Sequence, residues 1–77
     1  MKLDRDRIRA DIARLIHLDP ADIGDDDNLY DLGLDSMRVM QVLMEWEAAG
    51  MSADFALFAE QSTLAGWWSV LEQSGDA

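Results

Sequence analysis

The sequence predicts an all-α fold, a small four-helix bundle with a long loop between its first and second helices and a short third helix. Three stretches place apolar residues three and four positions apart, which is the spacing of one helix face. No stretch alternates apolar and polar residues as a half-buried strand does. The chain has 77 residues, the length of one domain. We therefore expect a single domain over residues 1–77, with helices over about 4–17, 36–49, 54–60 and 63–73.

Residues 4–17 are predicted to form the first helix. Its apolar residues fall at i, i+4, i+7 and i+8, which is a single face: Ile8, Ile12, Leu15 and Ile16. Asp4 is the expected N-cap, because a side-chain oxygen there can accept one of the unpaired N–H groups of the first turn. His17 is the only histidine and has no evident partner ligand, so we expect it to cap the helix end and not to bind a metal or act as a base.

A long loop is predicted from Leu18 to Asp35. Asp19 and Pro20 suit the cap and the first position of a short helical turn, whereas Gly24 and the acidic run after it break any longer helix. Four spaced apolar residues are expected to hold the loop against the core: Ile23, Leu29, Leu32 and Leu34. A loop of this length in so small a domain suggests a function. No frame of the acidic run matches a calcium-binding loop, so we expect no metal site.

The second helix is predicted to run from Ser36 to Ala49, with Gly50 as the residue that stops it. It carries two adjoining sets of apolar residues. One set is the expected core face: Val39, Val42, Leu43 and Trp46. The other is a methionine stripe: Met37, Met40 and Met44. Methionine fills irregular cores and also forms adaptable contact surfaces, so the stripe is either a wide core face or an exposed patch, and the periodicity by itself favours the core.

The last third of the chain is predicted to contain a turn over 50–53 and two helices. The helix over about 54–60 is apolar nearly all round, so part of it is buried or faces a partner. Thr63 is the expected cap of the fourth helix, whose apolar residues follow the i, i+3, i+4, i+7 spacing: Leu64, Trp67, Trp68 and Leu71. The first tryptophan suits the core and the second its rim. Residues 74–77 are expected to form a frayed tail.

The composition is acidic, with 16 Asp and Glu against 6 Lys and Arg and a formal net charge of −10. This charge disfavours nucleic acid and anionic membranes as partners and favours a basic protein surface. There is no cysteine, no targeting signal, and no apolar stretch near the ~20 residues of a membrane span. We expect a cytoplasmic protein that is a monomer in isolation. So small a domain has little room for a deep cleft, which counts against an enzyme, and we expect no catalytic residues.

Ser36 has three interpretations. The first is a serine at a helix start, where capping is common. The second is a hydrolase nucleophile, which needs a base, an orienting acid and an oxyanion hole, but the residues after Ser36 lack the second glycine of a nucleophile elbow. The third is a modified serine, because a helix N-terminus favours the negative charge of a phosphate ester. Asp35 could then hold a metal ion for the modifying enzyme, and Gly33 lets the loop turn closely.

The segment from Asp27 to Ser36 resembles the attachment motif of the phosphopantetheine-dependent acyl and peptidyl carrier proteins. The wider sequence is most similar to aryl carrier proteins of nonribosomal peptide synthesis of the siderophore type. The residues that carry this similarity are 33–40, Trp46, 54–55, 57–59, 63–64 and the pair Trp67 and Trp68. The resemblance runs from about residue 15 to residue 71. The chain departs from the aryl subgroup at Ser62, where that subgroup usually has proline.

The resemblance implies an acyl-carrier-protein-like bundle with a 4′-phosphopantetheine arm on Ser36, framed by Asp35 and Gly33. A phosphopantetheinyl transferase would install the arm from coenzyme A, an aryl-acid adenylating ligase would load it, and a condensation domain would take the acyl group. In the family, such partners dock on the second and third helices, which favours an exposed methionine stripe. By position, the docking residues are Met37, Arg38, Met40, Met44, Phe55 and Ala59.

Two alternatives remain open beside the aryl carrier. The nearest is a peptidyl or acyl carrier protein for an amino acid, a polyketide or a fatty acyl chain. The other is an acidic helical interaction module with no covalent group. The aryl carrier and the peptidyl or acyl carrier would both be acted on by other enzymes, and we expect neither to be an enzyme itself.

Overall fold

Four α-helices and one short 3₁₀ helix make up the secondary structure of residues 3–52 and 54–76, which are the residues that the computed structural model describes. In chain order the elements are α1 (Arg5–Ile16), η1 (Pro20–Asp22), α2 (Ser36–Ala48), α3 (Phe55–Ala59) and α4 (Leu64–Ser74). No strand occurs in this part of the chain. The predicted all-α, four-helix fold class is therefore confirmed.

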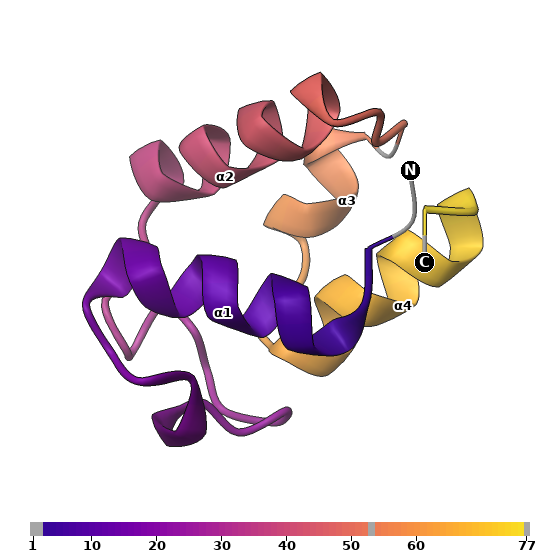
Figure 1. Ribbon diagram of the computed structural model, residues 1–77. Helices are drawn as coiled ribbons and strands as arrows, with labels where there is room; N and C mark the ends of the chain where they lie inside the picture. The colour runs from indigo at the N-terminus through magenta and orange to yellow at the C-terminus, as the bar shows by residue number, and fades with distance from the viewer. Residues whose placement is uncertain (1–2, 53, 77) are drawn as a thin grey trace.

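The helices form a closed ring of neighbours. Helix α1 packs against α2 and α4, and α3 packs against the same two helices from the other side. Figure 1 shows α1 and α2 running in opposite directions, with the long loop hanging below the end of α1. The first and last described residues, Leu3 and Asp76, are joined by a backbone hydrogen bond of 2.6 Å. No helix in the described ranges combines the length and the apolar character needed to cross a membrane.

Capping side chains fix where each α-helix begins. An acidic or hydroxyl oxygen at each N-cap accepts a backbone N–H from the first turn, which removes an unpaired donor. The pairs, with the N-cap first, are Asp4 with Arg7, Asp35 with Arg38, Asp54 with Ala56, and Thr63 with Gly66. The observed helices start and end within one residue of the predicted bounds, because the predicted ranges include some of the caps.

Two helix ends differ in how they are closed. Gly50 follows α2 with a φ of 109°, a conformation that favours glycine. His17 lies at the end of α1, as predicted, but its φ is 59° and its backbone N–H, not its imidazole, reaches the oxygen of Ala13. The predicted turn over 50–53 includes Ala53, which lies outside the described residues.

Three aromatic rings form the centre of the core. Trp46 of α2, Phe58 of α3 and Trp67 of α4 are each fully buried, and their ring centroids lie 5.1–6.2 Å apart. Two of the pairs meet edge to face, a favourable arrangement of aromatic quadrupoles. The indole N–H of Trp46 donates to Asp11 of α1 at 2.8 Å. The cluster of rings from α2, α3 and α4 is therefore also bonded to α1.

The long loop is held against the helices by buried apolar side chains, by backbone hydrogen bonds and by ion pairs. Its predicted apolar anchors are buried or half-buried, with Leu29 completely inaccessible. The backbone N–H of Leu29 donates to Ser62 at 2.7 Å, and the backbone oxygen of Asp25 accepts the N–H of Ala65 at 2.9 Å. The Asp25 carboxylate pairs with Arg5 and Arg9 of α1. The loop is thus fixed against α1 and the start of α4.

The predicted frayed tail is wrong for residues 74–76, and Ala77 lies outside the described part of the chain. Asp76 is only 4% exposed. Its carboxylate accepts the backbone N–H of Ser52 at 3.1 Å and the hydroxyl of Ser74 at 2.5 Å, and its backbone oxygen accepts the N–H of Leu3 at 2.6 Å. These bonds join the two chain ends and the connection between α2 and α3.

Two leucine-to-alanine substitutions test the division between core and surface. Leu43 is buried on α2, whereas Leu57 on α3 is 45% exposed. Leu43→Ala should lower the free energy of unfolding by about 2–5 kcal/mol, because it leaves a cavity. Leu57→Ala should change it by about 0.5 kcal/mol, as surface substitutions usually do. Urea unfolding of both variants measures the difference, and equal losses would contradict this packing.

Candidate functional site at the start of α2

Ser36 is the first residue of α2 and is exposed. Asp35 is the N-cap, so Ser36 itself is not needed to cap the helix. Within residues 3–52 and 54–76, no group forms a hydrogen bond with its hydroxyl. The capping interpretation of Ser36 is therefore replaced by that of a free hydroxyl at a helix N-terminus, where the unpaired N–H groups favour an incoming anion.

The loop before α2 turns at Gly33. This glycine has a φ of +117°, a conformation in which other residues are strained. A Cβ added there would lie 3.8 Å from Ile16, an ordinary contact, so the backbone angle and not the space requires glycine. Next to it, Leu34 is buried, and its N–H donates to Leu29 at 3.1 Å. The turn and this anchor place Ser36 at the surface.

Asp35 is held by Arg38 through both its backbone and its side chain. The carboxylate accepts the backbone N–H of Arg38 at 2.9 Å and its Nη1–H at 2.5 Å. These interactions hold the pKa of Asp35 below its ordinary value of 3.8, chiefly through the backbone bond, with the guanidinium charge adding to it. The Nε–H of Arg38 donates to the backbone oxygen of Leu15, which ties the start of α2 to the end of α1.

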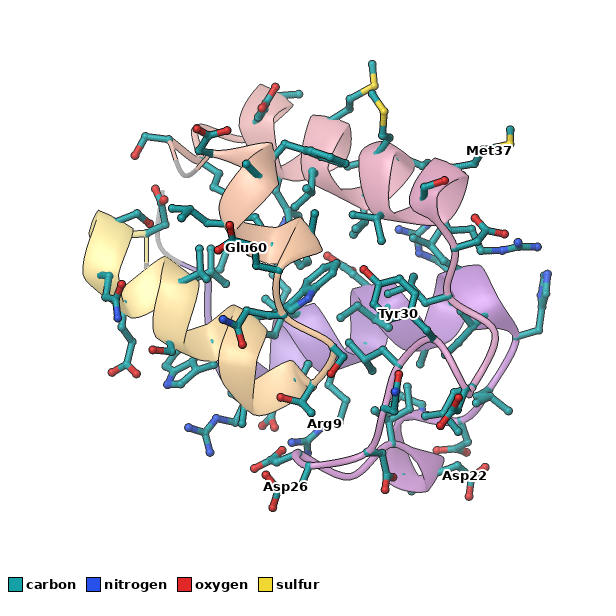
Figure 2. The ribbon with its side chains drawn as sticks, turned by 180° about the vertical axis from the view of Figure 1, so that it is seen from behind. Arg9, Asp22, Asp26, Tyr30, Met37 and Glu60 are labelled. Atoms are coloured by element: carbon teal, nitrogen blue, oxygen red, sulfur yellow. The ribbon has the colours of Figure 1, made fainter. Side chains whose placement is uncertain are left out.

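The methionine stripe of α2 is exposed, so the core reading that periodicity favours is wrong. Met37 is 81% exposed, Met40 50% and Met44 63%. The other, adjoining set of α2 apolar residues is buried, as predicted: Val39, Val42, Leu43 and Trp46. In Figure 2 the Met37 side chain points away from the molecule at the start of α2. A contiguous core does not need these methionines, which leaves them available for contacts.

Helix α3 and the loop extend this apolar surface. Phe55, Leu57 and Ala59 of α3 are exposed, while Phe58 turns inward. Leu57 and Tyr30 are exposed apolar residues that the sequence reasoning did not single out for the site. Figure 2 shows Tyr30 on the face of the molecule that α2 and α3 form. The all-round apolar character of α3 is the signal that could have included Leu57, whereas nothing in the sequence separates Tyr30 from the buried loop residues.

An open hollow of about 410 Å³ lies between the end of α1 and the start of α2. It contains both guanidinium groups of this region, the only histidine, and one carboxylate. The lining residues are Arg14, Leu15, His17, Asp35, Met37, Arg38 and Gln41. The hollow thus gathers positive charge in a chain whose formal net charge is −10.

The chemistry that this site offers is limited. The described residues contain no cluster of three or more potential metal ligands. Among the described residues no base contacts the Ser36 hydroxyl, so they do not form the paired nucleophile and base of a hydrolase. The site provides an exposed hydroxyl, an ionised carboxylate next to it, and apolar side chains on two neighbouring helices.

Comparison with known proteins agrees with this geometry. The family model described as "Phosphopantetheine attachment site" matches residues 6–68. The isochorismatase of Bacillus subtilis is 38% identical over 66 residues, covering 86% of this chain and 21% of that protein. Enterobactin synthase component B of Escherichia coli is 41% identical over 49 residues, covering 64% of this chain and 17% of that protein.

A shorter relative matches over most of its length. The acyl carrier protein ScoB of Streptomyces coeruleorubidus is 30% identical over 69 residues, covering 90% of this chain and 81% of the relative. The chain therefore spans only about a fifth of the first two relatives but most of this one. No solved structure gives a significant match.

The titration of Asp35 tests the local electrostatics. Its carboxyl ¹³C signal should titrate with a midpoint below pH 3.8. Because the folded pKa is lowered, the stability that the carboxylate contributes is complete above pH 3.8 and is lost as the pH falls through the folded pKa. In Arg38→Gln the midpoint should rise only part of the way, since the backbone bond remains. A wild-type midpoint at or above 3.8 would contradict the capping geometry.

Proposed function

The chain belongs to the phosphopantetheine attachment-site family, whose members carry a covalent 4′-phosphopantetheine, and from this premise we propose that it is an aryl carrier protein with its arm on Ser36. The observation that carries the proposal is the free, exposed hydroxyl of Ser36 at the start of α2, inside the matched segment. When bound, the arm supplies a thiol that holds an acyl group as a thioester. The residues of this chain position the attachment and present it to other proteins.

The attachment step uses the Ser36 hydroxyl as the nucleophile. Its Oγ forms a bond to the phosphorus of coenzyme A that bears the pantetheine, the pyrophosphate P–O bond breaks, and adenosine 3′,5′-bisphosphate leaves. The hydroxyl proton passes to solvent or to a base on the transferase, since no base in the part of the chain that the structure describes contacts Ser36. Asp35 lies beside the reacting oxygen in its ionised form and can assist a metal ion or a basic residue that a phosphopantetheinyl transferase brings.

The relatives support an aryl cargo. An isochorismatase and an enterobactin synthase component share the attachment region with this chain, and a role in siderophore synthesis together with the resemblance to aryl carrier proteins supports an aryl acid as the cargo. We propose that an aryl-acid adenylating ligase loads the arm and that a condensation domain or enzyme takes the acyl group. The acyl carrier protein relative supports the alternative, a carrier for an acyl chain. Loading assays with a panel of aryl and aliphatic acids and their ligases distinguish the two cargoes.

The exposed apolar surface is the proposed docking site for these enzymes. It contains the methionine stripe of α2 and the outward residues of α3, with Arg38 at its edge and Tyr30 and Leu57 as additions from the structure: Met37, Met40, Met44, Phe55, Leu57, Ala59, Tyr30 and Arg38. Flexible methionines suit a surface that must fit several partners in turn. The formal net charge of −10 favours partners with basic surfaces and raises their association rates. The chain itself acts as a carrier and not as an enzyme.

Replacement of Ser36 tests the attachment. Incubation with coenzyme A and a broad-specificity phosphopantetheinyl transferase should add the mass of one phosphopantetheine to the chain. Because the chain has no cysteine, the product should also show one titratable thiol where the starting protein has none. Ser36→Ala should abolish both changes, whereas Ser62→Ala, a control at another exposed serine, should retain them. A wild-type chain that gains no mass would refute the carrier assignment and favour an interaction module.

Charge insertion tests the docking surface. Met40→Asp and Phe55→Asp should each lower kcat/KM for loading by the ligase about tenfold or more. A charge buried at the centre of an interface weakens binding by about 1.4 kcal/mol or more, and 1.4 kcal/mol corresponds to a factor of ten. Both residues are exposed, so the unfolding free energy should change little. Ser69→Asp adds the same charge at an exposed position of α4, outside this surface, and the variant should be loaded normally. Normal loading by all three variants, with every partner tried, would contradict this surface.

A further inference from the structure

The hollow between the end of α1 and the start of α2 is directly next to Ser36. Its lining includes Asp35 and Met37, the residues on either side of Ser36 in the chain. From α1 it includes Arg14, Leu15 and His17. Its volume of about 410 Å³ lies within the range of about 300–1,000 Å³ that small-molecule sites occupy. Any group attached to Ser36 therefore has this hollow as a neighbour.

The two arginines of the hollow are held in position by hydrogen bonds, but some of their N–H groups have no acceptor among the described residues. Arg38 is fixed by its Nε bond to Leu15 and its Nη1 bond to Asp35. No acceptor among the described residues bonds to its Nη2 group. Arg14 uses its Nη2 group on both carboxylate oxygens of Glu45, at 3.2 Å each, and its side chain is 55% exposed. Unused N–H groups of both guanidinium ions are thus available to a further anion.

The lining of the hollow carries more arginines than carboxylates, although the chain as a whole is acidic. Two arginines stand against one lining carboxylate, Asp35, and the nearby Glu45 offsets part of the charge of Arg14. All five described arginines pair with an acid: Arg38 with Asp35, Arg14 with Glu45, Arg5 and Arg9 with Asp25, and Arg7 with Asp11. Arg14 and Arg38 are thus set apart by lining a hollow beside Ser36, and not by a lack of acidic partners.

We propose that this hollow binds the first part of the arm, namely its phosphodiester and the branched segment that follows. This inference rests on the proposed attachment at Ser36. The phosphodiester carries one negative charge and is bonded to Ser36, so it enters the reach of Arg38 and Arg14. The dimethyl group of the next segment packs on the side chains of Leu15 and Met37. The arm then leaves Ser36 over the end of α1, on the side away from α3.

The strength of this contact depends on the covalent tether. An exposed pair between a guanidinium and an anion contributes only about 0.2–1 kcal/mol, and Asp35 competes for Arg38. A tethered group, however, has an effective concentration in the millimolar range, so a weak site is populated without any loss of translational freedom. The contact should be partial and reversible, which leaves the thiol end of the arm able to reach other enzymes.

The test compares ¹H–¹⁵N spectra of the unmodified and the phosphopantetheinylated chain. Installation of the arm should shift the backbone amides of Leu15 and His17, which are distant from Ser36 in sequence. High salt should reduce these shifts, because the contact is electrostatic and exposed. Arg14→Gln and Arg38→Gln should each reduce them by at least half. Arg7→Gln removes one positive charge from the same helix, outside the hollow, and should leave them unchanged.

Three results would overturn the inference, and only the last of them also overturns the attachment at Ser36. A chain that gains the mass of the arm but shifts only residues 35–38, or these with α3, places the arm elsewhere and refutes this site alone. Equal shifts at Leu15 in the Arg14→Gln and wild-type chains would refute it as well. A chain that gains no mass refutes the attachment at Ser36, and this site with it.

Discussion

The contact of Trp46, Phe58 and Trp67 is the interaction on which the rest of the structure depends. The three rings come from α2, α3 and α4, and the Trp46 indole N–H reaches Asp11 of α1. One cluster therefore joins all four helices. In a chain of 77 residues the core is small, and each large ring supplies a correspondingly large part of the buried apolar area.

Helix α3 illustrates this dependence. It has five residues, far below the about 12–15 that an isolated helix needs to be even marginally stable in water. Phe58 is its only buried residue, and the Asp54 cap fixes its start. The burial of this single side chain therefore decides which way α3 faces. Phe55 and Leu57 are exposed as a consequence, and the apolar surface beside Ser36 follows from the packing of the core.

The sequence was sufficient to predict those features that arise from short-range physics. Side-chain caps such as Asp4 and Thr63 lie next to the groups they satisfy, and the buried face of α2 follows from helical spacing. Periodicity could not decide whether the methionine stripe was buried, because burial depends on how many neighbours surround α2. With α1 on one side and α3 on the other, no element remains to cover Met40 or Met44.

Contacts between distant parts of the chain were the features that could not be predicted. Asp76 reads as part of a polar tail, yet its carboxylate is buried against Ser52 and its backbone against Leu3. Nothing local to 74–77 encodes these partners. At the site, the position of Ser36 came from its motif, but the bonds from Arg38 to Asp35 and Leu15 require the end of α1 and the start of α2 to meet.

The same pairing shows why net charge is a poor guide to a local site. The formal charge of −10 is a sum over the chain, and it suggests an acidic surface around Ser36. The packing of α1 against α2 instead places Arg14 and Arg38 at one hollow and removes part of the charge of Asp35 through Arg38. At physiological salt, exposed charges are screened beyond about 8 Å. A group bonded to Ser36 therefore interacts mainly with these few side chains, and the nearest of them include the cations Arg14 and Arg38. A protein that approaches from farther away instead experiences the net negative charge of the whole chain.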